Sequence, residues 1–277
     1  MRLRGQDPLN QSFLEWIGLL TYNDDLRGFI PLHPAVEDVT TIQDLYHRVY
    51  PQTLLDAAPH DLTAFQSRGI LSTRCDLVAG TNDDVLALMP GSETQQFTVD
   101  TVQDCEVGDN EDLAIPPEVL RSLRLSSLPP AVLKLKVGAP ILLLRNLQPL
   151  VGLCNGTRLV VTRVASCVIE AKILGGSFDA HTRFIPRIDT TSSEKDFPMV
   201  IKRHQFPVQL CFAMTINKSQ GQSFDVLGVD LRNPVFTHGQ FYVAMSRVRD
   251  VRQLTACTSA NTEPRECLNI VYPELLL

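Results

Sequence analysis

The sequence has no long apolar run, no secretory leader and no paired cysteine motif. No segment approaches the ~18 consecutive apolar residues that a membrane-spanning helix needs, and residues 1–8 lack the apolar core of a secretory signal. The seven cysteines include no C-x-x-C pair, so we expect reduced thiols that are buried as small apolar side chains. These absences predict a soluble intracellular protein without a membrane partner. The length of 277 residues and the hydrophobic content of 44% suffice for one large domain or two modest ones.

The sequence also lacks a phosphate-binding loop and an acidic pair at the end of a strand. A loop that cradles phosphates needs the pattern G-x-x-x-x-G-K-[ST], but the only lysine followed by Ser or Thr is Lys218, which follows Asn217. No apolar strand ending in Asp-Glu precedes residue 133. The pairs Asp24-Asp25 and Asp83-Asp84 occur in turn or helix-start contexts, where surface charge or an N-cap is the expected role. The chain therefore predicts no metal site and no complete site for a nucleoside triphosphate.

Positive charge is scarce and unevenly distributed. The formal net charge is −6, which argues against a uniformly basic nucleic-acid binder. Residues 1–133 carry 8 Lys/Arg and 20 Asp/Glu, and residues 204–277 carry 6 of each kind. Residues 134–203, by contrast, carry 11 Lys/Arg and 5 Asp/Glu, a net charge of +6. This middle segment is the candidate for a polyanion contact, although charges on a solvated barrel surface are an alternative interpretation.

Apolar periodicity predicts an α/β domain at the start of the chain. Residues 10–20 carry a helical apolar stripe. The run from Thr40 to Asp44 predicts the capped start of a second helix, which Pro51 ends. The short apolar run 69–72 predicts a buried strand, and residues 83–89 predict a helix closed by Pro90-Gly91. A connector with one helix near 117–125 follows.

From residue 132 the pattern changes to short alternating strands separated by glycine turns. The runs are 133–137, 158–164, 167–174 and 181–188, which together suggest a small β-barrel. After Pro207 the α/β pattern returns, with apolar runs at 208–214 and 226–231 and a helix over 238–248. The sequence thus predicts an α/β domain interrupted by a basic β insert.

The run from Thr215 to Gly221 could bind phosphate. Glycine at position 221 allows a positive φ and a close approach of the backbone to a ligand. The side chains of Lys218 and Ser219 can contact phosphate oxygens, and Gln220 can hydrogen-bond a sugar or phosphate. An ordinary polar turn is the alternative.

The predicted helix 238–248 carries Arg247. An arginine on a helix of an α/β domain can reach a transferring phosphoryl group, where its permanent charge stabilises the transition state. A surface arginine in an ion pair is the alternative.

Together, the two runs resemble the end of the Pif-type (petite integration frequency) superfamily-one DNA helicases, including the helicase part of Helitron transposons. The resemblance rests on Thr215-x-x-Lys218-Ser219-Gln220-Gly221, a strand, and then Gly239-Gln240-x-Tyr242-Val243-Ala244-x-Ser246-Arg247-Val248. Residues 133–140, 152–159, 203–208, 69–72 and 82–83 agree with other segments of that family, and Met1-Arg2-Leu3 resembles the end of its Asn-Met-Arg segment. The similarity covers nearly the whole chain.

The resemblance implies a RecA-like parallel-sheet motor domain interrupted by a small barrel of the Src-homology-three type. Residues 1–24 would end a first RecA-like domain. Residues 25–137 and 206–277 would form the second one, and residues 138–205 would form the barrel.

The resemblance also assigns roles to individual residues. Arg247 would be the arginine finger, Arg2 a second sensor of the γ-phosphate, and Gly221 and Gln222 would approach the nucleotide. The residues implied to grip single-stranded DNA are Asn82, Thr215, Lys218, Ser219 and Gln220. ATP and Mg²⁺ are the implied cofactors of the complete helicase.

The first functional hypothesis is therefore the C-terminal part of an ATP-dependent 5′-to-3′ DNA helicase that acts in repair, recombination, replication or telomere maintenance. Without the two missing motifs, this chain is expected not to hydrolyse ATP alone, and a separate N-terminal half is an expected partner. A non-catalytic single-stranded-DNA-binding or regulatory module is the alternative, and an unfolded relic is a third. The expected compartment is the nucleus, or else the mitochondrion.

Overall fold

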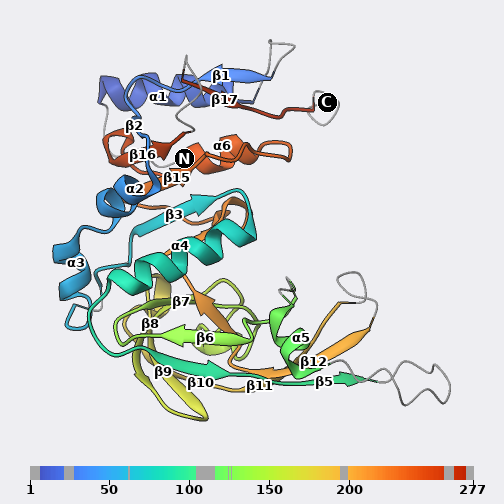
Figure 1. The fold of residues 1–277 in the computed structure, drawn as a ribbon. Helices are drawn as coiled ribbons and strands as arrows, with labels where there is room; N and C mark the ends of the chain where they lie inside the picture. The colour runs from blue at the N-terminus through green and yellow to red at the C-terminus, as the bar shows by residue number, and fades with distance from the viewer. Residues whose placement is uncertain are drawn as a thin grey trace. The chain divides into compact units, whose positions relative to one another are not determined.

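The computed structural model divides the chain into two compact units (Figure 1). It describes residues 7–21, 28–61, 63–103, 116–123, 125, 127–193, 199–258 and 265–272. Unit 1 comprises Met1–Ala57, Ala64–Leu88 and Phe212–Leu277, and unit 2 comprises Ala58–Thr63 and Met89–Cys211. The chain therefore leaves unit 1 and returns to it, as expected for a domain that carries an insert.

A five-stranded parallel sheet forms the centre of unit 1. Its strands, in spatial order, are β14 (Ala213–Thr215), β3 (Arg68–Ser72), β15 (Val226–Asp230), β16 (Leu254–Cys257) and β2 (Glu37–Val39). Every neighbouring pair is parallel, so all five carboxyl ends lie at the same edge. The inner strands are short, apolar and buried, as is usual for a parallel sheet covered on both faces. The predicted α/β architecture with a parallel sheet is confirmed.

Helices pack on this sheet largely where the sequence predicts them. In α2 (Ile42–Val49), the side chain of the N-cap Thr41 accepts a hydrogen bond from the Asp44 amide. This helix lies against β15, where Gly228 permits the close approach, since an added Cβ would lie 2.8 Å from Val49 Cγ2. The short α3 (Gln52–Ala57) follows at once.

The next helix, α4 (Cys75–Leu88), begins eight residues before the predicted start. Asp83 and Asp84 therefore lie inside the helix, and the expectation that they stand at its start is wrong. Both are exposed, and Asp84 accepts a hydrogen bond from the Tyr46 hydroxyl at 3.1 Å. The surface-charge interpretation fits them, whereas the N-cap does not. Asp24 and Asp25 lie outside the described residues.

The N-terminal helix α1 (Pro8–Leu19) has partners within unit 1. Its predicted apolar stripe is buried, and the Trp16 ring stands edge-on to Phe241 at 6.0 Å. The Trp16 indole donates to the Pro31 carbonyl, and buried Asn10 accepts the Val251 amide at 3.0 Å. With these contacts α1 packs within unit 1, and a cooperative melting transition is the test of the unfolded-relic hypothesis. A two-stranded antiparallel sheet of β1 (Phe29–Pro31) and β17 (Glu266–Leu268) belongs to the same unit.

Unit 2 is built mainly from antiparallel strands. The largest sheet has the order β10 (Thr182–Pro186), β9 (Val168–Ile173), β8 (Arg158–Val164), β7 (Pro140–Leu143) and β13 (Val208–Leu210). A second sheet joins β11 (Ile188–Thr191), β12 (Val200–Gln205) and β5 (Val99–Gln103), and a third joins β4 (Thr94–Phe97) and β6 (Val132–Leu135). The predicted helix near 117–125 is α5 (Pro117–Ser122). The predicted strands are present, but β4, β5, β7, β11 and β12 were not predicted.

The apolar run 208–214 forms two strands, β13 and β14, and not one continuous element. Its first part, β13, pairs antiparallel with β7 in unit 2. Its second part, β14, pairs parallel with β3 in unit 1. The chain passes from one unit to the other between Cys211 and Phe212.

Six described cysteines are free thiols. Cys211, Cys257 and Cys267 are buried, as expected, whereas Cys75 and Cys167 are exposed, contrary to that expectation. Burial raises the pKa of Cys257 to about 11 and that of Cys267 to about 12. Among the described residues, the longest and most apolar helices fall short of what a membrane crossing requires.

The buried side chain of Arg203 forms hydrogen bonds to three separate segments of unit 2. The guanidinium of Arg203 on β12 and the carboxylate of Asp100 on β5 are 1% and 4% exposed, and they form two hydrogen bonds of 2.8 and 2.9 Å. Arg203 also donates to the carbonyls of Pro129 and Leu120 at 2.8 and 3.0 Å. Because every charge in this network has a partner, burial is tolerated, but the loss of one partner would leave the other charge buried alone.

We predict that Arg203→Met destabilises the protein by about 3–5 kcal/mol, because Asp100 then lacks its countercharge. Denaturant unfolding measures this change. Lys202 on the same strand forms an exposed ion pair with Asp189, so Lys202→Ala is the matched control and should lower the free energy of unfolding by less than about 1 kcal/mol. The double variant Asp100→Leu/Arg203→Met should regain stability. Equal effects of Arg203→Met and Lys202→Ala would contradict the account.

Candidate functional site

The predicted site residues gather at the carboxyl edge of the parallel sheet in unit 1. Strand β14 ends at Thr215, and a single 3₁₀ turn, η3 (Ile216–Ser219), follows it. Ile216 and Ser219 are buried, while Lys218 and Gln220 are exposed. Ligands of open parallel sheets bind beyond the carboxyl ends of the strands, so the exposed side chains stand where a ligand is expected.

The edge strand β14 is held in place by buried polar side chains. The Asn82 amide on α4 donates to the Ala213 carbonyl at 3.1 Å and accepts the Ala213 amide at 2.8 Å. The Tyr50 hydroxyl donates to the Phe212 carbonyl at 2.6 Å. Asn82 is only 5% exposed, so its visible role is to complete the outer edge of β14. Its implied contact with DNA stays a prediction.

Within the turn, Ser219 has a structural role as well. Its side chain is fully buried and donates to the Ile216 carbonyl at 2.6 Å, which closes the 3₁₀ turn. The Gln222 amide donates to the Ser219 carbonyl at 3.0 Å, and the Gln222 side chain approaches the Lys218 carbonyl at 3.4 Å. The turn therefore presents Lys218 and Gln220 outward on a backbone that its own hydrogen bonds hold.

Gly221 adopts the positive φ that the sequence predicts. Its φ is +80°, and an added Cβ would meet no atom within 4 Å. Glycine is therefore favoured at position 221 by its backbone conformation, and not because a larger side chain would clash with a neighbour.

Helix α6 (Gln240–Met245) is shorter than the predicted helix 238–248. It starts after Gly239, whose φ of +67° places it in the left-handed region, and it ends at Met245. Arg247 therefore lies in the turn after the helix and not on the helix, which corrects the sequence-based placement. Arg249 follows and pairs with Asp225 at 3.1 Å.

The guanidinium of Arg247 is half-buried and bonded only to neutral oxygens. Its Nε donates to the Val243 carbonyl at 3.0 Å, and its Nη2 donates to the Ser246 hydroxyl at 2.7 Å. Its Nη1 approaches the Gln222 carbonyl at 3.4 Å. In the part of the chain that the structure describes, no carboxylate pairs with it. Burial lowers the pKa of Arg247, and nearby Tyr242 partly opposes this shift, but a guanidinium remains charged at neutral pH.

Backbone hydrogen bonds join the two sequence motifs. The Phe224 amide donates to the Arg247 carbonyl, and the Arg249 amide donates to the Phe224 carbonyl, both at 2.9 Å. Together with the approach of Arg247 to Gln222, these bonds connect the turn at 215–222 to the turn at 246–249. The structure thus brings together Thr215, Lys218, Gly221, Gln222 and Arg247. Arg2 lies outside the described residues.

Sequence analysis missed polar residues on neighbouring strands of the same edge. Ser72 and Asp230 are register partners on β3 and β15, and both are fully buried. Arg232 donates two hydrogen bonds of 2.9 Å to the Asp230 carboxylate, whereas the Ser72 hydroxyl has no partner among the described residues. The signal was available, because Ser72 ends one predicted buried strand and Asp230 is the next-to-last residue of another. No cluster of His, Cys, Asp or Glu suited to a metal ion occurs in the described segments.

We predict that Gly221→Ala destabilises the protein by about 1–2 kcal/mol, because alanine resists the left-handed conformation. Gly221→Asn should have a smaller effect, since asparagine tolerates that conformation. Thermal or denaturant unfolding of the three proteins measures this order. An alanine variant as stable as the wild type would show that the positive φ is not required.

Comparisons with known proteins identify related sequences. The family model for the 2B domain of the DNA helicase Pif1 matches residues 118–164. The ATP-dependent DNA helicase PIF1 of Rattus norvegicus is 33% identical over 202 residues, which cover 67% of this chain but only 27% of that relative. The chain thus spans roughly a quarter of the length of this curated relative.

Solved Pif1 structures share the fold. The crystal structure of Pif1 helicase from Candida albicans superposes with a TM-score of 0.61 at 22% identity, over 96% of this chain and 56% of that one. Pif1 helicase from Bacteroides, in complex with ADP-AlF3 and ssDNA, gives a TM-score of 0.59 at 20% identity, over 99% of this chain and 53% of that one. The chain is therefore a homologue of the Pif1 DNA helicases, matched over a part of their length.

Proposed function

We propose that this chain supplies the C-terminal part of an ATP-dependent helicase that moves 5′-to-3′ on single-stranded DNA. The observation that carries the proposal is the hydrogen-bonded link between the turn at 215–222 and Arg247. This link connects the turn at 215–222, whose exposed side chains can contact DNA phosphates, to the guanidinium of Arg247, which can contact a nucleotide. The homology to helicases that use ATP supports both ligands.

In this proposal, residues 25–137 and 206–277 form the second RecA-like motor domain, and the parallel sheet of unit 1 is its core. That sheet supports this assignment. Residues 138–205 form a barrel of the Src-homology-three type, and the antiparallel sheet of β7 to β10 is consistent with it. Unit 2 is larger than that segment, since it also includes residues 89–137. Residues 1–24 are proposed to end the first RecA-like domain, although α1 (Pro8–Leu19) packs within unit 1 in this structure.

Arg247 acts as the arginine finger on ATP that is bound mainly by another part of the helicase. A half-buried guanidinium with only neutral partners among the described residues keeps its full charge for a phosphate. Gly221 and Gln222 approach the nucleotide, and Arg2 senses its γ-phosphate. Mg²⁺ accompanies ATP in the complete enzyme. Since this sequence has no G-x-x-x-x-G-K-[ST] loop, the chain alone does not hydrolyse ATP.

The side chains that contact DNA in this proposal are the exposed Lys218 and Gln220 together with Thr215. Ser219 and Asn82 act through the backbone that they hold. Such phosphate contacts bind without regard to base sequence. Because the missing phosphate loop also fits a non-catalytic chain, a single-stranded-DNA-binding module is the second candidate. The nucleus or the mitochondrion would hold the DNA substrate.

We predict that the purified chain binds single-stranded DNA with a marked salt dependence but does not turn over ATP. Joined to the preceding part of a Pif1 relative, it should show DNA-stimulated ATP hydrolysis. In that chimera, Arg247→Ala should lower the turnover rate by roughly 10³-fold or more, since an arginine finger contributes effects of that size. Steady-state ATPase assays and fluorescence anisotropy measure the two activities.

The matched control is Arg249→Ala in the same chimera, because this neighbour pairs with Asp225 and should leave most of the turnover intact. DNA-stimulated hydrolysis by the chain alone would contradict the proposal. A chimera that turns over ATP equally well with Arg247→Ala would favour the non-catalytic module.

A further inference from the structure

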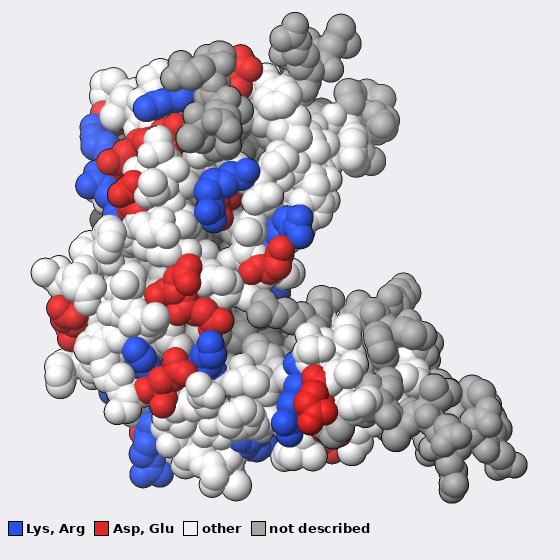
Figure 2. Space-filling model, viewed as in Figure 1, with Lys and Arg blue, Asp and Glu red and all other residues white. Residues whose placement is uncertain are grey.

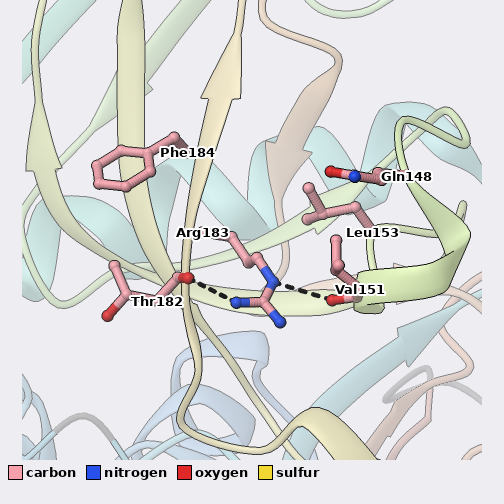
Figure 3. Close-up of a pocket in the computed structure, with 6 residues that line it drawn as sticks. All are labelled: Gln148, Val151, Leu153, Thr182, Arg183 and Phe184. Carbon is pink, nitrogen blue, oxygen red and sulfur yellow. Dashed lines mark hydrogen bonds between the residues drawn. The ribbon is translucent and has the colours of Figure 1, made fainter.

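Unit 2 contains a pocket that lies outside the proposed motor site. It has a volume of about 320 Å³ and is lined by Gln148, Val151, Leu153, Thr182, Arg183 and Phe184 (Figure 3). These residues come from the edge strand β10 and from the segment around the 3₁₀ turn η1 (Pro149–Val151). Its volume is near the lower end of the range for ligand pockets.

The pocket holds a positioned cation. Arg183 Nε donates to the Val151 carbonyl and Nη1 donates to the Thr182 carbonyl, both at 2.9 Å, as Figure 3 shows. The guanidinium carbon also lies 5.9 Å from the centre of the Phe178 ring. No carboxylate of the described residues pairs with Arg183, and neither hydrogen bond uses its Nη2. This arrangement leaves the charge and one donor group for an anionic ligand.

The turn beside this cation depends on a glycine. Gly152 follows η1 with a φ of +86°, and an added Cβ would lie 2.7 Å from Phe178 Cδ2 and 3.1 Å from Ile173 Cδ1. A side chain at position 152 would thus push η1 away from the barrel wall. Close packing of Gly152 against Phe178 and Ile173 therefore fixes the turn that forms one side of the pocket.

Apolar side chains are unusually exposed around the pocket. Phe184 is 61% exposed and Leu150, at the tip of η1, is 89% exposed. Figure 3 shows Phe184 and Arg183 leaving β10 on opposite sides, as alternation along a strand requires. Because both line the pocket at this edge, one ligand can contact an aromatic ring and a guanidinium together.

The charges near Phe184 favour a polyanion over a peptide. Lys172 on β9 is the register partner of Thr182 and so lies on the same face as Phe184. Glu170, directly opposite Phe184, is approached by Arg163 at 3.9 Å, which offsets its charge. Figure 2 shows acidic and basic side chains interspersed over the visible face, so the site is defined by this local grouping and not by a broad basic patch.

From this geometry we propose that the pocket is a second contact site for single-stranded nucleic acid. A base stacks on the exposed ring of Phe184, and the adjoining phosphate reaches around the edge strand β10 to bind Arg183. Aromatic stacking combined with phosphate contacts is the usual way in which proteins hold single strands without reading their sequence. The proposal rests on the proposed DNA-binding function and adds a subsite in unit 2 to the grip at 215–222.

The test measures the affinity of the full chain for an oligothymidine strand by fluorescence anisotropy at several salt concentrations. Phe184→Ala should weaken binding roughly tenfold, since a stacked base contributes effects of that order. Arg183→Gln should reduce the slope of log affinity against log salt by about 1, as expected for one lost phosphate contact. Phe97→Ala, which removes another exposed ring of unit 2 (53% exposed), is the matched control and should leave affinity unchanged.

An abasic strand separates stacking from a change in folding. Removing the bases should weaken the binding of the strand to the wild-type protein. The same removal should weaken binding to the Phe184→Ala variant by a fold-change roughly ten times smaller. If Lys218→Ala weakens binding but Phe184→Ala and Arg183→Gln do not, the pocket proposal is wrong while the motor-site proposal stands. In that case a peptide becomes the better ligand. If the chain binds no single-stranded DNA, both proposals are overturned.

Discussion

The parallel pairing of β14 with β3 is the contact on which the candidate site depends. The chain re-enters unit 1 at Phe212 after more than a hundred residues in unit 2, and β14 has only three residues. Such a short edge strand needs support beyond its ladder with β3. Asn82 supplies it by pairing both atoms of its side-chain amide with the Ala213 backbone, and Tyr50 binds the preceding carbonyl. Because both side chains are buried, their hydrogen bonds are shielded from water and fix where the turn at 215–222 begins.

From this anchor, the site follows through a chain of local constraints. The 3₁₀ turn η3 is closed by Ser219, Gly221 reverses the backbone in the left-handed region, and Phe224 pairs with the backbone on both sides of Val248. The position of Arg247 is thereby linked to the turn that we propose to grip DNA. In a motor, such a link would let a change at the DNA alter the position of a charge at the nucleotide. The proposed function depends on this link between the two turns.

Sequence alone predicted the parts of the fold whose signals are local. The capped start of α2, the apolar stripe of α1 and the positive φ of Gly221 were all correct, because each depends on residues within one or two turns. The errors involve distant partners. The run 208–214 is apolar except for Gln209, so nothing between Leu210 and Met214 marks the change from β13 to β14. Strand β4 contains Gln95 and Gln96 and is largely exposed, which removes the alternation that identifies a strand. The hydrogen bonds of Asn82 to the Ala213 backbone, 131 residues away, also had no local signal in the sequence, and its implied contact with DNA stays a prediction.

The account's central claim is that the turn at 215–222 and the turn containing Arg247 behave as one unit. Amide hydrogen exchange, followed residue by residue with and without single-stranded DNA, tests it most directly. The account predicts that DNA slows exchange in the 215–222 turn and also at Phe224 and Arg249, whose amides form the hydrogen bonds between the two turns. Slower exchange confined to 215–222, with Phe224 and Arg249 unchanged, would contradict it.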